Sequence, residues 1–201
     1  HLLGYMLDIT HAELLAELAH IQAERLKRCQ NTVALLQELG VEVDYEDVTA
    51  VANGESLGRP HVAAALVNRG VVSTPAEAFA RYLRRGRPAY VDRYRLSPTR
   101  AIALIRAAGG LPVLAHPKLV RRDALLPELV GVGLGGLEAY HSQHTPHDVA
   151  RYLRLADKYH LLVTGGTDSH GPAGTAPVAI GAVAVPDACA ERLLAWKERQ
   201  A

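Results

Sequence analysis

The chain has 201 residues, is 49% apolar and 21% charged, and carries a net charge of +1. This length indicates one folded domain with room for an insertion, and the near-neutral charge excludes a general attraction to nucleic acid or anionic membranes. Since no apolar run reaches 18 residues, we expect no membrane span, and since the opening "HLLGYMLDIT" lacks a basic n-region and a cleavage site, we do not interpret it as a signal peptide. Its two cysteines, Cys29 and Cys189, lie outside any CxxC pair and are typical of free thiols in a cytoplasmic protein.

The first half of the chain predicts a buried strand over residues 1–7 and then a helical block over residues 10–95. A long helix is expected over residues 10–40, with Thr10 as its N-cap and Glu13 completing a capping box. Its apolar positions recur at helical spacing and predict a buried stripe of Leu14, Leu18, Ile21, Cys29, Val33 and Leu36.

Three shorter elements complete the helical block. Residues 41–52 predict a turn or short strand, and residues 59–70 predict a helix. A further helix is expected over residues 74–86, because Thr74 is a suitable N-cap and Pro75 suits the first helical position.

Beyond residue 95, apolar runs alternate with helical patterns. Such alternation predicts an α/β fold with a parallel sheet, whose strands read as continuous apolar runs. The expected strands are 111–117, 134–141 and 161–171, the expected helices are 97–110, 121–131, 145–160 and 187–200, and residues 177–186 are expected to be extended.

Polar side chains follow these apolar runs, where the carboxyl ends of parallel strands gather functional residues. The residues concerned are His116, Glu138, His141, His144, Asp168 and His170, and His1 opens the chain. His116, Asp168 and His170 together would suit zinc, manganese or iron. The alternative is structural: His116 would bond a loop, Asp168 would cap a helix, and His170 would lie on the surface. The remaining histidines, His11, His20, His147 and His160, are expected to be structural or exposed.

Five segments then occur in a recognisable order: "HLLGY", "GRPHVA", "AGGLPVLAHP", "GGLEAYHSQHTP" and "VTGGTDSHG". Together they resemble the polymerase and histidinol phosphatase (PHP) family of metal-dependent phosphoesterases. The closest subgroup includes 3',5'-nucleoside bisphosphate phosphatases and 5'-3' exoribonucleases. The resemblance implies a distorted (β/α)7 TIM-like barrel, a helical insertion, and two or three divalent ions (Mn, Zn or Fe).

The resemblance also implies roles for particular residues. His1, His116, Asp168 and His170 match positions of metal ligands in the family. The segment "GRPH" places Arg59 and His61 where the insertion approaches the substrate phosphate, and a planar guanidinium suits phosphate oxygens. His144 resembles a histidine that lines the same pocket.

One departure from the family pattern is important. The family opens with an H-x-H strand, an aspartate, and then a further histidine and glutamate, and none of these precedes His1 in this sequence. The resemblance therefore implies a partial barrel, with strand 1–9, insertion 10–95 and carboxyl-terminal half 96–201. The sequence leaves open whether the chain is a fragment, which we favour, or a truncated gene product.

The expected activity is hydrolysis of a phosphate ester of a nucleotide, either a nucleoside 3',5'-bisphosphate or an RNA 5' end. Full activity would need the missing part of the barrel, and an open sheet edge could allow self-association. Two alternatives remain. Residues 81–95 carry six arginines and three tyrosines, a pattern typical of single-stranded RNA binding as well as of a solvated helix face. The chain could also be an inactive remnant.

Overall fold

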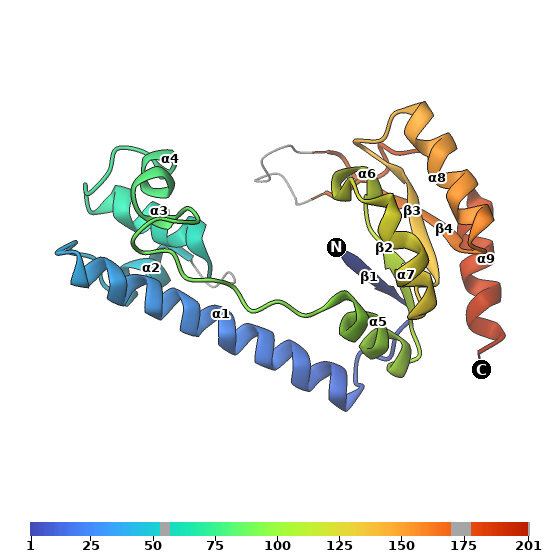
Figure 1. Cartoon of the computed structure of the whole chain (residues 1–201), viewed down its shortest axis with the longest axis horizontal. Helices are drawn as coiled ribbons and strands as arrows, with labels where there is room; N and C mark the ends of the chain where they lie inside the picture. The colour runs from blue at the N-terminus through green and yellow to red at the C-terminus, as the bar shows by residue number, and fades with distance from the viewer. Residues whose placement is uncertain (53–56, 170–177, 201) are drawn as a thin grey trace. The chain divides into compact units, whose positions relative to one another are not determined.

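The computed structural model describes residues 1–52, 57–169 and 178–200. The chain divides into two compact units (Figure 1). We call residues 1–14 and 96–201 the sheet unit and residues 15–95 the helical unit.

The sheet unit is built on four strands in the order β1-β2-β3-β4. These strands are β1 (Leu2–Tyr5), β2 (Leu111–Leu114), β3 (Gly136–His141) and β4 (Leu162–Gly166). The last three are parallel, as predicted. The first strand, β1, for which the sequence predicted no direction, runs antiparallel to β2. The strand β1 is also only half-buried, because it lies at the edge of the described sheet.

Helices cover both faces of this sheet (Figure 1). They are α5 (Pro98–Ala107), α6 (Pro117–Val120), α7 (Leu126–Gly131, after a 3-10 turn at Asp123–Leu125), α8 (Pro146–Lys158) and α9 (Asp187–Glu198). On one face, Leu137 packs with Ile102 of α5 and Tyr152 of α8. On the other face, Val113 packs with Leu193 of α9. Since all of these side chains are 8% exposed or less, the sheet is the centre of the core.

Local signals explain where these helices begin. Ser97 Oγ accepts the backbone N–H of Arg100 at the start of α5. At the start of α8, Thr145 and Asp148 form a reciprocal capping box. Each such cap satisfies backbone N–H groups that have no partner inside the helix.

The helical unit contains α1 (Ala12–Glu38, whose first turn belongs to the sheet unit), α2 (Tyr45–Ala52), α3 (Arg59–Asn68), and α4 (Pro75–Ala78), which continues into a π-helical turn (Phe79–Leu83). Thr74 caps α4 as predicted. The prediction of a turn or strand over residues 41–52 is wrong. Asp47 accepts the backbone N–H of Asp44 at 2.9 Å, and the cap so formed starts α2.

Two predictions for the long helix are also wrong. Its N-terminal cap is His11, whose Nδ1 accepts the backbone N–H of Leu14 at 3.4 Å, whereas Thr10 donates to Asp8. The predicted apolar stripe is buried only in its second half: Cys29, Val33 and Leu36 lie in the core, but Leu18 is 46% exposed. The side chains of α2 and α3 cover only that second half of the helix.

Three further findings concern the whole described chain. Residues 178–186 form a loop with a turn at Ile180 and Gly181, rather than the expected extended segment. Cys29 and Cys189 are free thiols, and burial raises the pKa of both. No described helix combines the length and the apolar character that a bilayer crossing requires.

Candidate functional site

The topology of the sheet brings one end of β1 to the carboxyl ends of the parallel strands. His116 lies two residues beyond β2, His141 is the last residue of β3, and Asp168 lies two residues beyond β4. Because β1 is antiparallel to β2, its first residues meet the end of β2, and the His1 carbonyl accepts the backbone N–H of Ala115 at 3.2 Å. Four predicted or noted polar residues therefore lie along one edge of the sheet.

The closest contact at this edge joins two imidazole rings. His1 Nδ1 lies 3.0 Å from His116 Nε2, and the rings meet edge to face. His116 is 8% exposed, and its Nδ1 is buried with no hydrogen-bond partner among the described residues. Two nitrogens on one tetrahedral zinc lie about 3.4 Å apart, given Zn–N distances of about 2.0–2.1 Å. The pair thus fits a shared divalent ion after a small separation, and equally fits a direct hydrogen bond.

The other predicted ligands are less closely grouped. Asp168 Oδ2 lies 3.8 Å from His141 Nε2, and its side chain is 41% exposed. His170 lies outside the described residues. Within residues 1–52, 57–169 and 178–200, no three His, Cys, Asp or Glu side chains are close enough together to hold a metal ion. The described part of the predicted ligand set is therefore one close histidine pair with a carboxylate farther off.

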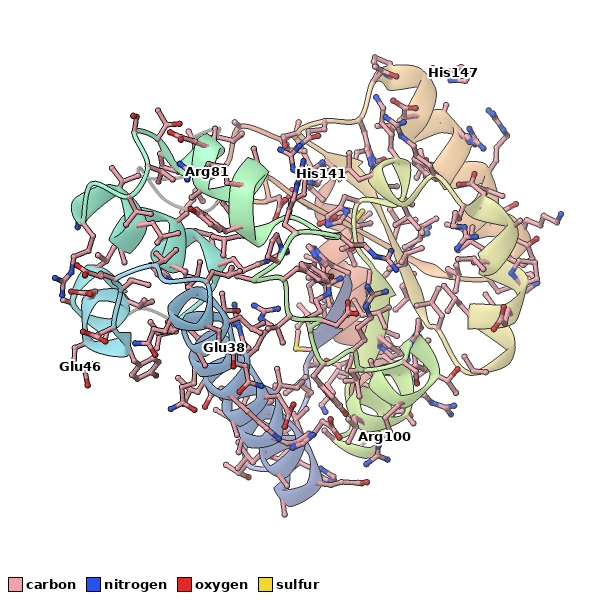
Figure 2. All side chains as sticks on the ribbon, turned by 60° about the vertical axis from the view of Figure 1, so that its left-hand side comes forward. Glu38, Glu46, Arg81, Arg100, His141 and His147 are labelled. Atoms are coloured by element: carbon pink, nitrogen blue, oxygen red, sulfur yellow. The ribbon has the colours of Figure 1, made fainter. Side chains whose placement is uncertain are left out.

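His141, labelled in Figure 2, continues the row of histidines from His116. Its Nδ1 accepts the backbone N–H of Gln143 at 3.1 Å, so the neutral ring carries its hydrogen on Nε2. Burial, followed by the nearby His144, lowers the pKa of His141 and favours this neutral form. Its Nε2–H is buried on the side of Asp168, whose Oδ2 lies 3.8 Å away. It is therefore a hydrogen-bond donor at the edge of the site, beside a candidate ligand carboxylate.

His144 has the opposite arrangement. Its Nδ1 lies 2.8 Å from the Ala139 carbonyl oxygen, which can only accept, so Nδ1 carries the hydrogen. The Nε2 lone pair is buried without a described partner. His144 and His141 also line a cavity of about 450 Å³, together with apolar residues such as Val149 and Val178. The two neighbouring imidazoles thus differ at Nε2, where His141 carries a hydrogen and His144 a lone pair, and both Nε2 atoms are buried.

Glu138 was noted at the end of a strand but was not predicted as a site residue. It is 5% exposed, and its Oε2 accepts the backbone N–H of His116 at 2.7 Å. Burial raises the pKa of this carboxyl, while the hydrogen bond from His116 acts in the opposite direction. A glutamate within the apolar run "LGGLEAYH" was the available signal, because a carboxylate is rarely buried without a partner.

Two candidate ligands have an unusual backbone conformation. His116 has φ +30° and Asp168 has φ +53°, in the left-handed region that side chains other than glycine seldom adopt. Strain of this kind persists where the surrounding structure imposes it, and it is common at functional sites. For His116, the bond to Glu138 is part of that surrounding structure.

Arg59 and His61 belong to the helical unit. Arg59 donates to the Leu83 carbonyl at 3.2 Å and lies over the rings of Phe79 and Tyr90. His61 Nδ1 accepts the backbone N–H of Gly58 at the start of α3. Their predicted approach to the substrate phosphate stays a prediction.

The histidines expected to be structural or exposed have such roles where the structure describes them. His11 caps α1, and the ring of His20 contacts that of Tyr94. His147, labelled in Figure 2, is exposed in the first turn of α8. His160 follows α8 with φ +53°.

Comparison with known proteins shows that the chain is similar to hydrolases of phosphate esters, although no family model matches it. Over 144 residues it is 38% identical to a phosphoribosyl 1,2-cyclic phosphate 1,2-diphosphodiesterase of Eggerthella lenta, covering 71% of this chain and 55% of that protein. It is 33% identical to a 5'-3' exoribonuclease of Haemophilus influenzae, and the match covers 87% of this chain and 65% of that protein. It is 30% identical to a 3',5'-nucleoside bisphosphate phosphatase of Chromobacterium violaceum, and the match covers 86% of this chain and 62% of that protein. The chain therefore spans 55–65% of the length of these relatives.

A solved structure extends this relationship. A protein of Bifidobacterium adolescentis, assigned to the metal-dependent phosphoesterases, superimposes with a TM-score of 0.75 at 33% identity. The match covers 97% of this chain and 70% of that protein. With the motif order of the sequence and the histidine-rich sheet edge, these similarities show that the chain belongs to the PHP family of metal-dependent phosphoesterases.

Proposed function

We propose that the chain contributes to hydrolysis of a nucleotide phosphate ester, at a centre of divalent ions on the carboxyl edge of its sheet. His1, His116 and Asp168 would hold the ions together with His170. The observation that carries this proposal is the pair of imidazole nitrogens, His1 Nδ1 and His116 Nε2, 3.0 Å apart at that edge. Nitrogen and carboxylate donors of this kind suit zinc, manganese and iron.

The proposal includes a finer description of the fold. The four-stranded sheet and its helices would form part of a distorted (β/α)7 barrel, with residues 1–9 as one strand and residues 96–201 as its second half. Residues 10–95 would be an insertion. The likeness to the Bifidobacterium adolescentis protein over 97% of the chain supports this description.

Bound divalent ions lower the pKa of water and offset negative charge on phosphoryl oxygens. The chain's own residues would position these partners. Glu138 fixes the backbone of His116 through its hydrogen bond to the His116 N–H. The Nε2–H of His141 can donate to a phosphoryl oxygen, whereas the Nε2 lone pair of His144 can accept from a substrate hydroxyl or amino group. Arg59 and His61 would contact the phosphate from the helical unit.

The substrate would be a nucleoside 3',5'-bisphosphate or an RNA 5' end. The names of the Haemophilus influenzae and Chromobacterium violaceum relatives support these two classes. The Eggerthella lenta relative adds a third class, a cyclic phosphate diester. Since this chain spans 55–65% of each relative, the activity proposed here is that of the protein with a full set of ligands.

The proposal is tested by assaying the protein with a full set of ligands for release of phosphate or nucleoside monophosphate from these three substrate classes. Manganese is first added and then removed by a chelator. Activity should depend on manganese and fall to background in His116→Ala. The exposed residue His147 provides the matched control, because His147→Ala removes a histidine from the same unit without touching the sheet edge. Turnover that survives the chelator, or that His116→Ala leaves unchanged, would refute the proposal.

A further inference from the structure

A second candidate binding site lies in the helical unit, on the side of α1 that faces residues 91–95. It is a cavity of about 220 Å³, lined by Ile21, Glu24, Arg25, Arg28, Arg93 and Tyr94. Three of these six residues are arginines, and one is acidic. The lining therefore carries an excess of positive charge.

The segment that carries Arg93 is held against α1 by its neighbour Tyr94. The Tyr94 hydroxyl donates to Glu17 Oε1 at 2.9 Å, and its ring meets the His20 ring edge to face at 4.8 Å. Glu17 and His20 lie one turn of helix before Ile21 and Glu24, so these contacts fix the segment beside the cavity. The Tyr94 side chain nevertheless remains 42% exposed, so part of its ring is accessible.

The three arginines are not neutralised by the residues that the structure describes. Arg69 and Arg81 of the same unit form ion pairs with Asp47 and Glu77. By contrast, the side chains of Arg25, Arg28 and Arg93 have no ion pair or hydrogen bond within the described ranges, including with Glu24 of the same cavity.

Arg28 is the most confined of the three. Its side chain is partly buried, and burial lowers its pKa. The positive charges of Arg59, Arg25 and Arg93 lower that pKa further, because each disfavours another cation nearby. Three neighbouring guanidinium groups thus act on Arg28, and a bound anion would offset their positive charge.

We propose that this cavity binds a phosphate of single-stranded nucleic acid, with a neighbouring base against the exposed part of the Tyr94 ring. Arginine forks suit phosphate oxygens, and aromatic rings stack on any base, which together give binding without sequence preference. The site goes beyond the hydrolysis proposed above, because binding here needs none of the metal ligands. It would favour a substrate with several nucleotides over a mononucleotide.

The test is fluorescence anisotropy of a labelled 12-residue oligouridylate with the full chain, in the presence of a chelator and over a range of salt concentrations. The double variant Arg28→Ala with Arg93→Ala should weaken binding about tenfold or more, and should lower the salt slope by about one for each phosphate that its side chains no longer neutralise. The matched control is Arg154→Ala with Arg192→Ala, which removes the same charge from exposed positions on α8 and α9. The RNA affinity of this control should stay within about twofold of that of the unmodified chain, as expected when the removed charges contact no phosphate.

Conservative variants separate the arginine contacts from the tyrosine contact. Tyr94→Phe loses the hydrogen bond to Glu17 but keeps the ring and its contact with His20, so it should bind more tightly than Tyr94→Ala, which loses both. Arg28→Lys with Arg93→Lys keeps the charge and should bind more tightly than the alanine pair. Far-UV circular dichroism confirms that each variant is folded.

Three results would overturn the proposal: an equal loss of affinity in the charge-matched control, displacement of the RNA by an equal concentration of inorganic phosphate, or tighter binding to phosphatidylserine vesicles than to RNA. The outcome is independent of the hydrolysis proposal. His116→Ala should keep RNA binding in the chelator, and the Arg28 and Arg93 double variant should keep manganese binding.

Discussion

The backbone N–H of His116 donates to the buried carboxylate of Glu138 at 2.7 Å, and so connects the end of β2 to the middle of β3. Glu138→Ala should leave this N–H without an acceptor and destabilise the fold by about 1–3 kcal/mol. Glu138→Gln keeps an acceptor oxygen and should lower the free energy of unfolding by less than Glu138→Ala does. Urea unfolding followed by circular dichroism measures both changes. An equal loss of unfolding free energy in the two variants would show that the hydrogen bond is not the stabilising contact.

His141 and His144 should be opposite tautomers. Their backbone partners, Gln143 N–H and Ala139 carbonyl, place the hydrogen on Nε2 of His141 and on Nδ1 of His144. Long-range ¹H–¹⁵N correlation spectra of the imidazole rings distinguish the two forms, and His141→Ala and His144→Ala assign the signals. The same tautomer in both rings would contradict the roles of donor and acceptor proposed for them.

The cap of α8 should make stability depend on acid pH. Hydrogen bonds from Lys118 and Thr145 hold the pKa of Asp148 well below its usual range. A carboxyl with a lowered pKa in the folded state adds stability above its unfolded pKa of about 3.9, and that stability is lost as the pH falls further. Asp148→Asn should therefore lower the melting temperature at pH 7, and this difference should shrink progressively as the pH falls from 4 to 2.

The control for this prediction is Asp157→Asn, in the last turn of the same helix, which should change the melting temperature little at either pH. A difference between Asp148→Asn and the unmodified chain that stays constant from pH 7 to pH 2 would contradict the linkage.

Much of this fold could be predicted from local signals. Caps such as Ser97 and Thr74 mark helix starts in the sequence, and continuous apolar runs mark the parallel strands. The direction of β1 could not be read in this way, because strand pairing depends on contacts between segments more than 100 residues apart. The cap of α2 was missed because alternating "VEVD" imitates a strand.

For the site, the sequence predicts that His116 and Asp168 follow strands, but not which of their atoms meet. Only the antiparallel pairing of β1 explains how His1 reaches His116. The apolar run around Glu138 indicated that this carboxylate is buried with a partner, but the partner, the backbone N–H of His116, could not be read from the sequence. The tautomers of His141 and His144 likewise depend on backbone groups of the β3 strand and the turn after it.

Metal affinity should depend on His116. Loss of one of a few protein ligands should weaken manganese or zinc binding by more than about tenfold in His116→Ala, measured by equilibrium dialysis of the full chain. His147→Ala should bind as the unmodified chain does, because His147 is exposed on α8 away from the sheet edge. Equal affinity in all three proteins would place the metal elsewhere.

The proposed function depends above all on a divalent ion at the edge of the sheet, between His1 and His116. Crystals of the chain soaked in manganese, with anomalous diffraction recorded above and below the manganese absorption edge, would locate such an ion. We expect a peak within bonding distance of both His1 Nδ1 and His116 Nε2. A well-occupied manganese peak elsewhere, with these two nitrogens still hydrogen-bonded to each other, would contradict the proposed metal centre.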